Sequence, residues 1–151
     1  MSNKTIVQLL EENELNVSTL YALYAKKIPS KSAFWGKLSQ EEIFHAESIK
    51  KDGKENDLAN SIIENNFSRG IIKYVSDFVL KEIQKAEEKE SLSHSEALQT
   101  ALRIEQSLLE KKCFDIFAPT NTTLKDLFKK LNADTQKHTQ LLIKELEKSQ
   151  G

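Results

Sequence analysis

The stretch EEIFHAESI, residues Glu41–Ile49, raises the question on which the fold and the function of the chain depend. With Leu38 before it, the stretch follows helical spacing, and its apolar face should step from Leu38 to Ile49 in threes and fours. Glu42 and His45 fill the steps between, one helical turn apart on the face that should be apolar. A buried carboxylate is costly unless it is paired or binds a metal ion. The stretch is therefore either a chance pair or part of a metal site, and the other helices decide between them.

The composition favours one helical domain and excludes several classes of function. The chain has 151 residues with only four Gly and two Pro, and 22 Lys and Arg are balanced by 23 Asp and Glu. A net charge of -1 with interspersed signs gives no basic footprint for nucleic acid, and the short apolar runs do not span a membrane. The N-terminus has no signal-peptide pattern, and the single Cys113 cannot form an internal disulfide. We therefore expect a cytoplasmic protein with neither nucleic-acid nor membrane partners.

Four amphipathic segments form two pairs. The first pair covers residues 3–50 and is interrupted before Pro29, and the second covers residues 94–148 and is interrupted around Pro119. Each segment carries apolar residues at helical spacing. Short breaks within each pair predict two antiparallel helix hairpins.

A long connector, residues 51–93, joins the two pairs. Its apolar content predicts a helix over 71–88, with Gly53 ending the preceding helix and Ser93 or Ser95 capping the next. Strand-like alternation and Gly-rich phosphate loops are absent from the sequence. The sequence predicts a single all-α domain over residues 1–151, with an extra helix in the crossover between two helix pairs.

Every apolar stripe is interrupted by an ionisable residue at an inward position. These residues are Glu14 in the first segment, Glu42 and His45 in the second, Glu105 in the third, and His138 with Asp134 or Thr135 before it in the fourth. The spacing also repeats, because Glu14 and His45 are 31 residues apart and Glu105 and His138 are 33 apart. Di-metal sites in helix bundles use a Glu from each of two helices and Glu-x-x-His from each of the other two.

These residues give the chain a resemblance to a known family. The matching stretches are ENELNVSTLYALYAKK, FWGKLSQEEIFHAESI, EALQTALRIEQSLLEKKCFDIF and LKDLFKKLNADTQKHTQLL, which cover nearly the whole chain outside the crossover. In them the sequence resembles the rubrerythrin-like branch of the ferritin-like superfamily. The resemblance implies a ferritin-like four-helix bundle with a long crossover between helices two and three, and a non-haem site for two iron ions.

The resemblance also implies roles for individual residues. It places Glu14, Glu42, His45, Glu105 and His138 at ligand positions, with Asp134 as the nearby acid of the fourth helix and Tyr21 as the phenol that orients a carboxylate. It further implies reduction of peroxide or oxygen, or iron handling, by an oxidoreductase that an external electron donor re-reduces. Related bundles commonly pair, so a homodimer is expected.

The sequence departs from the family pattern at three places. Thr135 stands three residues before His138, where Glu is expected, and Asp134 is one residue further away. Leu102 and Leu108 flank Glu105 where rubrerythrins carry another carboxylate, and Lys112 replaces a second phenol. The chain has no Cys-x-x-Cys pair for an attached rubredoxin-type centre.

Two other interpretations compete with the di-iron one. A metal-free helical interaction or scaffold protein would keep the bundle and lose the site, and Thr135 favours that interpretation. A mononuclear site at Glu14, Glu42 and His45 lies between the two. Residues outside these clusters are expected to be structural, with His94 facing solvent and the remainder in the core: Cys113, Trp35, Tyr24, Phe114 and Phe117.

Overall fold

The computed structural model describes residues 6–55, 66–110 and 122–150, and these are almost entirely helical. They form α1 (Ile6–Lys27), the 3-10 helix η1 (Pro29–Lys31), α2 (Ser32–Glu55), α4 (Asn66–Glu88), α5 (His94–Glu110) and α6 (Thr122–Gln150). Within the described ranges there is no strand, which confirms the predicted all-α class. The expected core positions of Cys113, Phe114 and Phe117, and the position of Lys112, lie outside the described residues.

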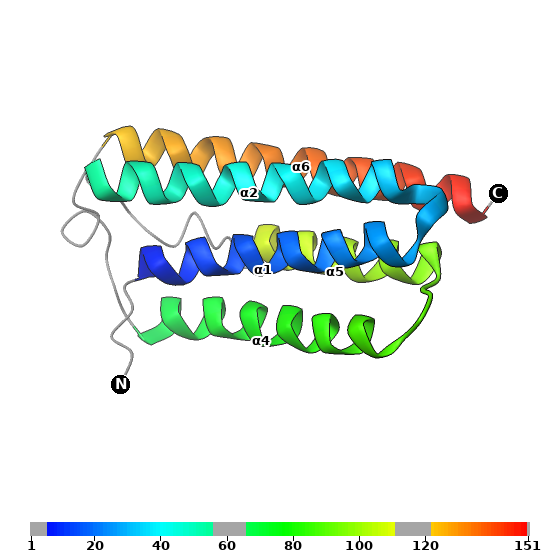
Figure 1. The fold of residues 1–151 in the computed structure, drawn as a ribbon. Coiled ribbons are helices and arrows are strands. Elements are labelled where there is room, and N and C mark those ends of the chain that lie inside the picture. Colours follow the sequence, from blue (N-terminus) through cyan, green and yellow to red (C-terminus); the bar gives the residue numbers. More distant parts are fainter. Residues whose placement is uncertain (1–5, 56–65, 111–121, 151) are drawn as a thin grey trace.

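The long helices lie alongside one another in two layers with α4 added at one side (Figure 1). The hairpin α1–α2 turns at η1, and α5 and α6 contact each other as the second pair. Helix α2 lies along α6, while α4 packs mainly on α1. Residues on α1, α2, α5 and α6 can therefore meet between the helices, far from either chain end.

The ends of the helices follow from local chemistry. Pro29 has no backbone N–H and α1 ends before it, where Lys26 and Lys27 complement the negative end of the helix dipole. Ser93 caps α5, because its hydroxyl oxygen accepts a hydrogen bond from the N–H of Glu96 at 3.3 Å. The prediction that Gly53 ends the second helix is wrong, since α2 continues to Glu55. A single helical Gly costs only about 1 kcal/mol relative to Ala, which a long helix can tolerate.

The core consists of the predicted apolar stripes. The largest fully buried side chains include Trp35, Tyr21, Leu38 and Leu98, so the placement of Trp35 in the core is confirmed, as is that of Tyr24. Other buried stripe residues are Leu10, Val17, Ile49, Ala101, Leu127, Leu131 and Leu142. Their burial forces the ionisable residues at the same helical phase to point inward as well.

Helices α1 and α2 approach closely through two small polar residues next to the core. The hydroxyl of Ser18 donates to the carbonyl oxygen of Ser39 at 2.9 Å, and the hydroxyl of Ser39 donates to the carbonyl oxygen of Ser18 at 2.9 Å. These reciprocal bonds satisfy both hydroxyl groups in a buried position. They also fix the axial register of α1 against α2.

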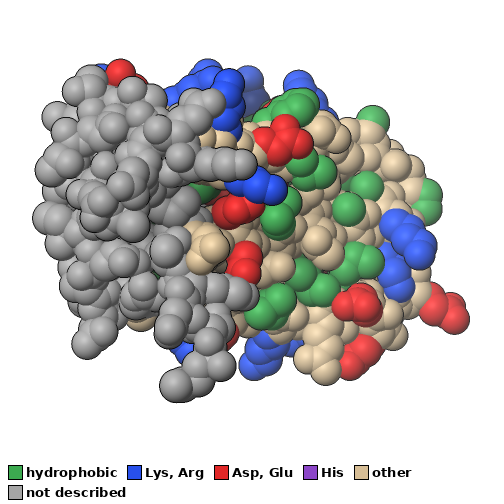
Figure 2. All heavy atoms as spheres, turned by 60° about the vertical axis from the view of Figure 1, so that its left-hand side comes forward, with side chains coloured by type: hydrophobic (Ala, Val, Ile, Leu, Met, Phe, Trp, Pro, Cys, Tyr) green, Lys and Arg blue, Asp and Glu red, His purple; other side chains and the backbone are tan. Residues whose placement is uncertain are grey.

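The surface is of mixed charge. On the face in Figure 2, Lys and Arg side chains alternate with Asp and Glu around apolar side chains. Among residues 6–55, 66–110 and 122–150, no helix combines the length and the apolar character needed to cross a membrane.

Candidate metal centre

Four helices each contribute a buried ionisable side chain at the same depth of the structure. These are Glu14 on α1, Glu42 and His45 on α2, Glu105 on α5 and His138 on α6. All five are less than 9 % exposed. The helical periodicity that buries the neighbouring Leu and Tyr residues places them there, so the sequence-predicted residues do converge.

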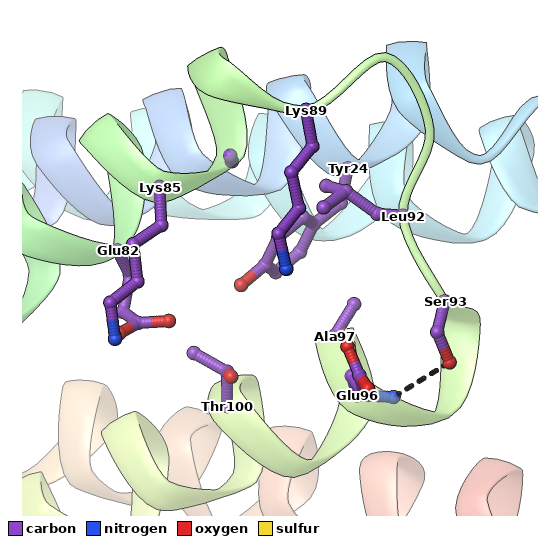
Figure 3. Close-up of a pocket in the computed structure, with 10 residues that line it drawn as sticks. Tyr24, Glu82, Lys85, Lys89, Leu92, Ser93, Glu96, Ala97 and Thr100 are labelled. Atoms are coloured by element: carbon purple, nitrogen blue, oxygen red, sulfur yellow. Dashed lines mark hydrogen bonds and ion pairs between the residues drawn. The ribbon is translucent and has the colours of Figure 1, made fainter.

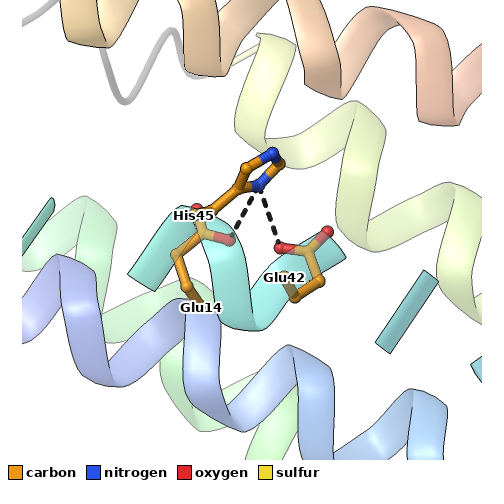
Figure 4. Close-up of side chains that lie close together, drawn as sticks. All are labelled: Glu14, Glu42 and His45. Atoms are coloured by element: carbon orange, nitrogen blue, oxygen red, sulfur yellow. Dashed lines mark ion pairs between the residues drawn. The ribbon is translucent and has the colours of Figure 1, made fainter. Parts of the chain in front are cut away.

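One group consists of Glu14, Glu42 and His45 (Figure 4). The Nδ1 atom of His45 lies 3.6 Å from Oε2 of Glu14 and 3.5 Å from Oε2 of Glu42. In Figure 4 both carboxylates face the same ring nitrogen, and the second nitrogen points away from them. One inward nitrogen and two carboxylates can hold a metal ion.

A second group consists of Glu42, Glu105 and His138. The Nδ1 atom of His138 lies 3.2 Å from Oε1 of Glu42 and 3.3 Å from Oε1 of Glu105. Potential ligand atoms within each group are all within 4.8 Å of one another. Glu42 thus belongs to both groups, with Oε2 facing His45 and Oε1 facing His138. A carboxylate in this position can bridge two ions.

The outer nitrogens of the two rings contact acids from the opposite helix. On α2, the Nε2 atom of His45 lies 3.2 Å from Oδ2 of Asp134 on α6. On α6, the Nε2 atom of His138 lies 2.6 Å from Oε1 of Glu41 on α2. Each acid stands four residues before the His of its own helix, so the two contacts are reciprocal. A carboxylate on the outer N–H fixes the tautomer and the orientation of a metal-binding His.

This geometry changes the interpretation of the fourth helix. Asp134 was predicted as a ligand, but the structure places it on the outer side of His45 and outside both three-residue groups. Asp134 corresponds to Glu41 and not to Glu42. The counterpart of Glu42 is Thr135, whose buried hydroxyl donates to the carbonyl oxygen of Leu131 at 2.9 Å.

The sequence interpretation missed Glu41. The available signal was the acid four residues before each His, which EEIFH and DTQKH share. The Glu-x-x-His pattern covers only the position three residues before His, and in that pattern Asp134 resembles a displaced ligand.

Without a metal ion, the carboxylates hold both rings protonated. Burial by itself lowers the pKa of His45, but contacts with Glu14 and Glu42 outweigh burial and raise the pKa to about 10. The pKa of His138 is likewise lowered by burial but raised overall, to about 11, by Glu105 and Glu42. The rings are stacked with their centroids 5.7 Å apart. Two adjacent imidazolium groups are stable there only because carboxylates surround them.

The pKa values of the shared carboxylate Glu42 and of Glu14 are shifted in opposite directions. Burial, together with the nearby Glu42, raises the pKa of Glu14 well above its ordinary value. Burial also raises the pKa of Glu42, but Glu14 and the two rings outweigh it, and the net pKa is lowered. Among the described residues, Oε2 of Glu14 is buried without a hydrogen-bond partner. Such an orphaned oxygen, directed at His45, is an atom that a cation would satisfy.

The phenol of Tyr21 connects the two halves of the structure. Its hydroxyl donates a hydrogen bond to Oε1 of Glu105 at 3.1 Å, from α1 to α5. Burial, followed by the charges of Glu105 and Glu42, raises the pKa of Tyr21 well above its ordinary value, so it remains a donor. The contact is the one expected of a phenol that orients a carboxylate.

A groove of about 700 Å³ between α2 and α6 reaches the outer side of both rings. Its lining includes His45, His138, Asp134, Leu131 and Phe44. The two imidazole rings thus form part of its wall.

A smaller pocket of about 60 Å³ between α4, α5 and α1 contains none of the predicted ligands (Figure 3). Figure 3 shows the hydroxyl of Tyr24 directed into it, on the side of Thr100.

The prediction that His94 faces solvent is wrong. Its ring lies against Trp35, whose indole N–H donates to Nδ1 of His94 at 3.1 Å, and its Nε2 lies 3.2 Å from Oε1 of Glu145. The side chain of His94 is only 14 % exposed. The sequence context of Ser residues around His94 indicated a helix start but carried no sign of this contact.

The outer acids give a first prediction. Glu41→Gln or Asp134→Asn should weaken divalent-metal affinity about 10- to 100-fold while leaving the number of bound ions unchanged, because each acid orients a ring without holding an ion. Competitive titration with a metal chelator measures the affinity. Glu47→Gln, an exposed acid on α2, is the matched control and should leave the affinity unchanged. Loss of an ion in Asp134→Asn would show instead that Asp134 is a ligand.

Comparisons with known proteins identify no relative of this chain. No family model matches the chain, and neither a curated protein nor a solved structure matches it.

Proposed function

We propose that this protein is a non-haem di-iron protein of the ferritin-like, rubrerythrin-like type that reduces peroxide. The observation that carries the proposal is the shared position of Glu42 between two buried groups, each with one inward His and one further Glu. Such a centre needs two ions and a bridge between them, and a mononuclear site would need neither Glu105 nor His138.

The donor set fits iron. Three carboxylates and two imidazoles suit borderline and harder divalent metals, whereas zinc sites of the structural type prefer Cys and His in a closed tetrahedron. Oε2 of Glu14 fits as well, since it has no hydrogen-bond partner and lies 3.6 Å from Nδ1 of His45, the nitrogen that faces both carboxylates. Thr135 provides no carboxylate, so fewer positions around the ions are taken by protein and more remain for an oxidant.

The order of the helices supports the ferritin-like assignment. The described chain has an α1–α2 hairpin, a crossover that includes α4, and an α5–α6 pair. The candidate ligands come from both pairs and none comes from α4. A long crossover is what distinguishes ferritin-like bundles from those with short loops throughout. A homodimer and a cytoplasmic location remain part of the proposal.

An iron pair at this centre would supply the two electrons that reduce a peroxide to water. The residues of the chain set the conditions for that chemistry. Glu42 presents one oxygen to each ring. Glu14 completes the group at His45, and Glu105 completes the group at His138. Tyr21 keeps Glu105 in one orientation through its hydrogen bond to Oε1. The groove would admit the oxidant on the side of His45 and His138, which both line it.

The reaction with peroxide tests the proposed activity. Protein loaded anaerobically with ferrous iron should be oxidised faster than the same concentration of free ferrous iron, and should consume one hydrogen peroxide for each pair of ferrous ions. Stopped-flow absorbance with a peroxide assay measures both. Glu47→Gln should behave as the unaltered protein. Oxidation at the rate of free iron, or oxidation unchanged by Glu42→Gln, would contradict the proposal.

Thr135 favours a second candidate, a metal-free bundle that acts as an interaction module. In that case the acids and rings exist only to satisfy one another. Replacing Glu42 by Leu would then be neutral or stabilising, because apolar packing often matches or exceeds a buried ionic cluster. Under the di-iron proposal, the same replacement removes the stabilisation that bound iron gives to the folded state.

A further inference from the structure

An unbroken series of aromatic contacts leads from the candidate ligand Glu105 toward the surface. Its first member is Tyr21, whose hydroxyl donates to Oε1 of Glu105 at 3.1 Å. The ring of Tyr21 lies 5.5 Å from that of Trp35, centroid to centroid, at an interplanar angle of 49°. Both side chains are fully buried. The phenol and the indole are therefore in direct contact, with the phenol already bonded to the centre.

The series continues from Trp35 through a hydrogen-bonded His. An indole N–H can only donate, so Nδ1 of His94, 3.1 Å away, must accept. The proton of a neutral His94 is then on Nε2, which donates to Oε1 of Glu145 at 3.2 Å. Glu145 also pairs with Lys31 at 3.2 Å, and the side chain of Lys31 is 44 % exposed. The series ends at the surface.

The path and the groove lie toward different ends of the helices. Trp35 and His94 belong to the first turns of α2 and α5, and Glu145 lies near the end of α6. These parts meet at the end where α1 turns into α2 (Figure 1). The groove is lined by later residues of α2 and earlier residues of α6, such as Ser48 and Asp126. An oxidant and an electron donor could thus reach the centre without competing for one entrance.

We propose that Tyr21 and Trp35 form an electron relay between the metal centre and a one-electron carrier that docks beside His94. The relay rests on the proposed function, because it requires an oxidising centre at Glu105. It would connect the centre to a donor outside these 151 residues, which contain no Cys-x-x-Cys pair.

The electrons and protons of the relay balance. Reduction of one hydrogen peroxide to two waters takes two electrons and two protons. Two encounters with the one-electron carrier would provide the electrons, and solvent entering the groove would provide the protons. In each passage Tyr21 would give up one electron toward the centre and its phenol proton to Oε1 of Glu105. Trp35 then returns one electron to Tyr21, which takes back its proton, and shifts the indole proton toward Nδ1 of His94. The carrier returns one electron to Trp35, and the indole proton returns with it.

Light-driven oxidation of the metal-free protein tests the relay without iron. A ruthenium photosensitiser is attached to Ser32→Cys, an exposed position one turn before Trp35, after Cys113 has been changed to Ser. Flash oxidation should produce an indole radical that Tyr21 then reduces, so that its decay coincides with the rise of a phenoxyl radical. This electron step runs from Tyr21 to Trp35, opposite to turnover, and tests the coupling between the two rings. Trp35 is the only Trp of the chain, so the indole spectrum has one source.

Two Tyr variants test whether the radical passes specifically to Tyr21 or to any Tyr that packs against Trp35. Tyr24 also packs against Trp35, with ring centroids 4.8 Å apart, but its hydroxyl points into the pocket of Figure 3. Tyr21→Phe should abolish the phenoxyl signal and prolong the indole radical, whereas Tyr24→Phe should leave both unchanged. Circular dichroism verifies that each variant is folded.

Three results would overturn the relay. They are the absence of an indole radical, its decay without a phenoxyl radical, and a phenoxyl signal that survives Tyr21→Phe. Iron content, measured separately, keeps the two proposals distinguishable. A relay that operates in a protein unable to bind iron would overturn the proposed function, while iron binding without radical transfer would overturn the relay alone.

Discussion

Glu42→Gln should remove both iron ions, whereas Glu14→Gln and Glu105→Gln should each remove one. The reason is that Glu42 faces both inward ring nitrogens and the other two acids each face one. The amide keeps the size of the side chain but provides a single neutral carbonyl oxygen and cannot bridge two cations. Since loss of an orienting contact alone costs about 10- to 100-fold in metal affinity, loss of the bridge should cost more than about 100-fold. Iron retained after gel filtration, measured by mass spectrometry, gives the number of ions per chain.

The iron content of the three variants together distinguishes two bridged ions from a single ion. Glu47→Gln is the control for the loss of one negative charge. A mononuclear site at Glu14, Glu42 and His45 would instead make Glu105→Gln silent. Equal iron content in Glu42→Gln and in the unaltered protein would contradict the shared position of Glu42.

The metal-free protein should lose stability as the pH rises from about 6.5 to 10. The pKa values of His45 and His138 are raised in the folded protein, to about 10 and about 11, from an ordinary value of 6.5. Because the pKa of each His is higher in the folded than in the unfolded protein, protonation stabilises the fold fully below pH 6.5. This stabilisation is lost as the pH rises toward the pKa values of the folded protein. The raised pKa of Glu14 acts in the same direction from a lower pH. The lowered pKa of Glu42 has the opposite effect, but only at acid pH.

Linkage gives a loss of about 1.4 kcal/mol per pH unit for each ring, so the expected loss over this range is several kcal/mol in the free energy of unfolding, or roughly 10 °C or more in melting temperature. Thermal denaturation between pH 6 and pH 10 measures it. A double variant, His45→Gln with His138→Gln, should flatten the dependence. Iron-loaded protein should show none of it, because bound ligands are already deprotonated and iron binding releases their protons. A pH-independent melting temperature in the metal-free protein would refute the protonated rings.

Most of the fold could be predicted from periodicity, because apolar spacing reports which face of a helix is buried. The stripe through Leu10, Val17 and Tyr21 is buried as expected. Helix ends were predicted where a residue acts alone, as Pro29 and Ser93 do. The end at Gly53 was wrong because Gly lowers helix stability only slightly, and the neighbouring turns decide whether the helix continues.

The five inward residues at the candidate centre were also predictable, because a charged residue in an apolar stripe is visible in the sequence. Their partners across helices were not. The contacts of Glu41 with His138 and of Asp134 with His45 depend on how α2 and α6 face each other, which no single-helix pattern encodes. The bond between Trp35 and His94 joins residues 59 apart and was missed for the same reason.

A crystal of the protein soaked in ferrous iron under anaerobic conditions, with anomalous scattering measured at the iron edge, tests the central claim most directly. We predict two peaks about 3.5–4 Å apart. One should lie among Glu14, Glu42 and His45 and the other among Glu42, Glu105 and His138. The absence of any peak there, with the carboxylates still against the rings, would contradict the account, and a single peak would contradict the bridge at Glu42.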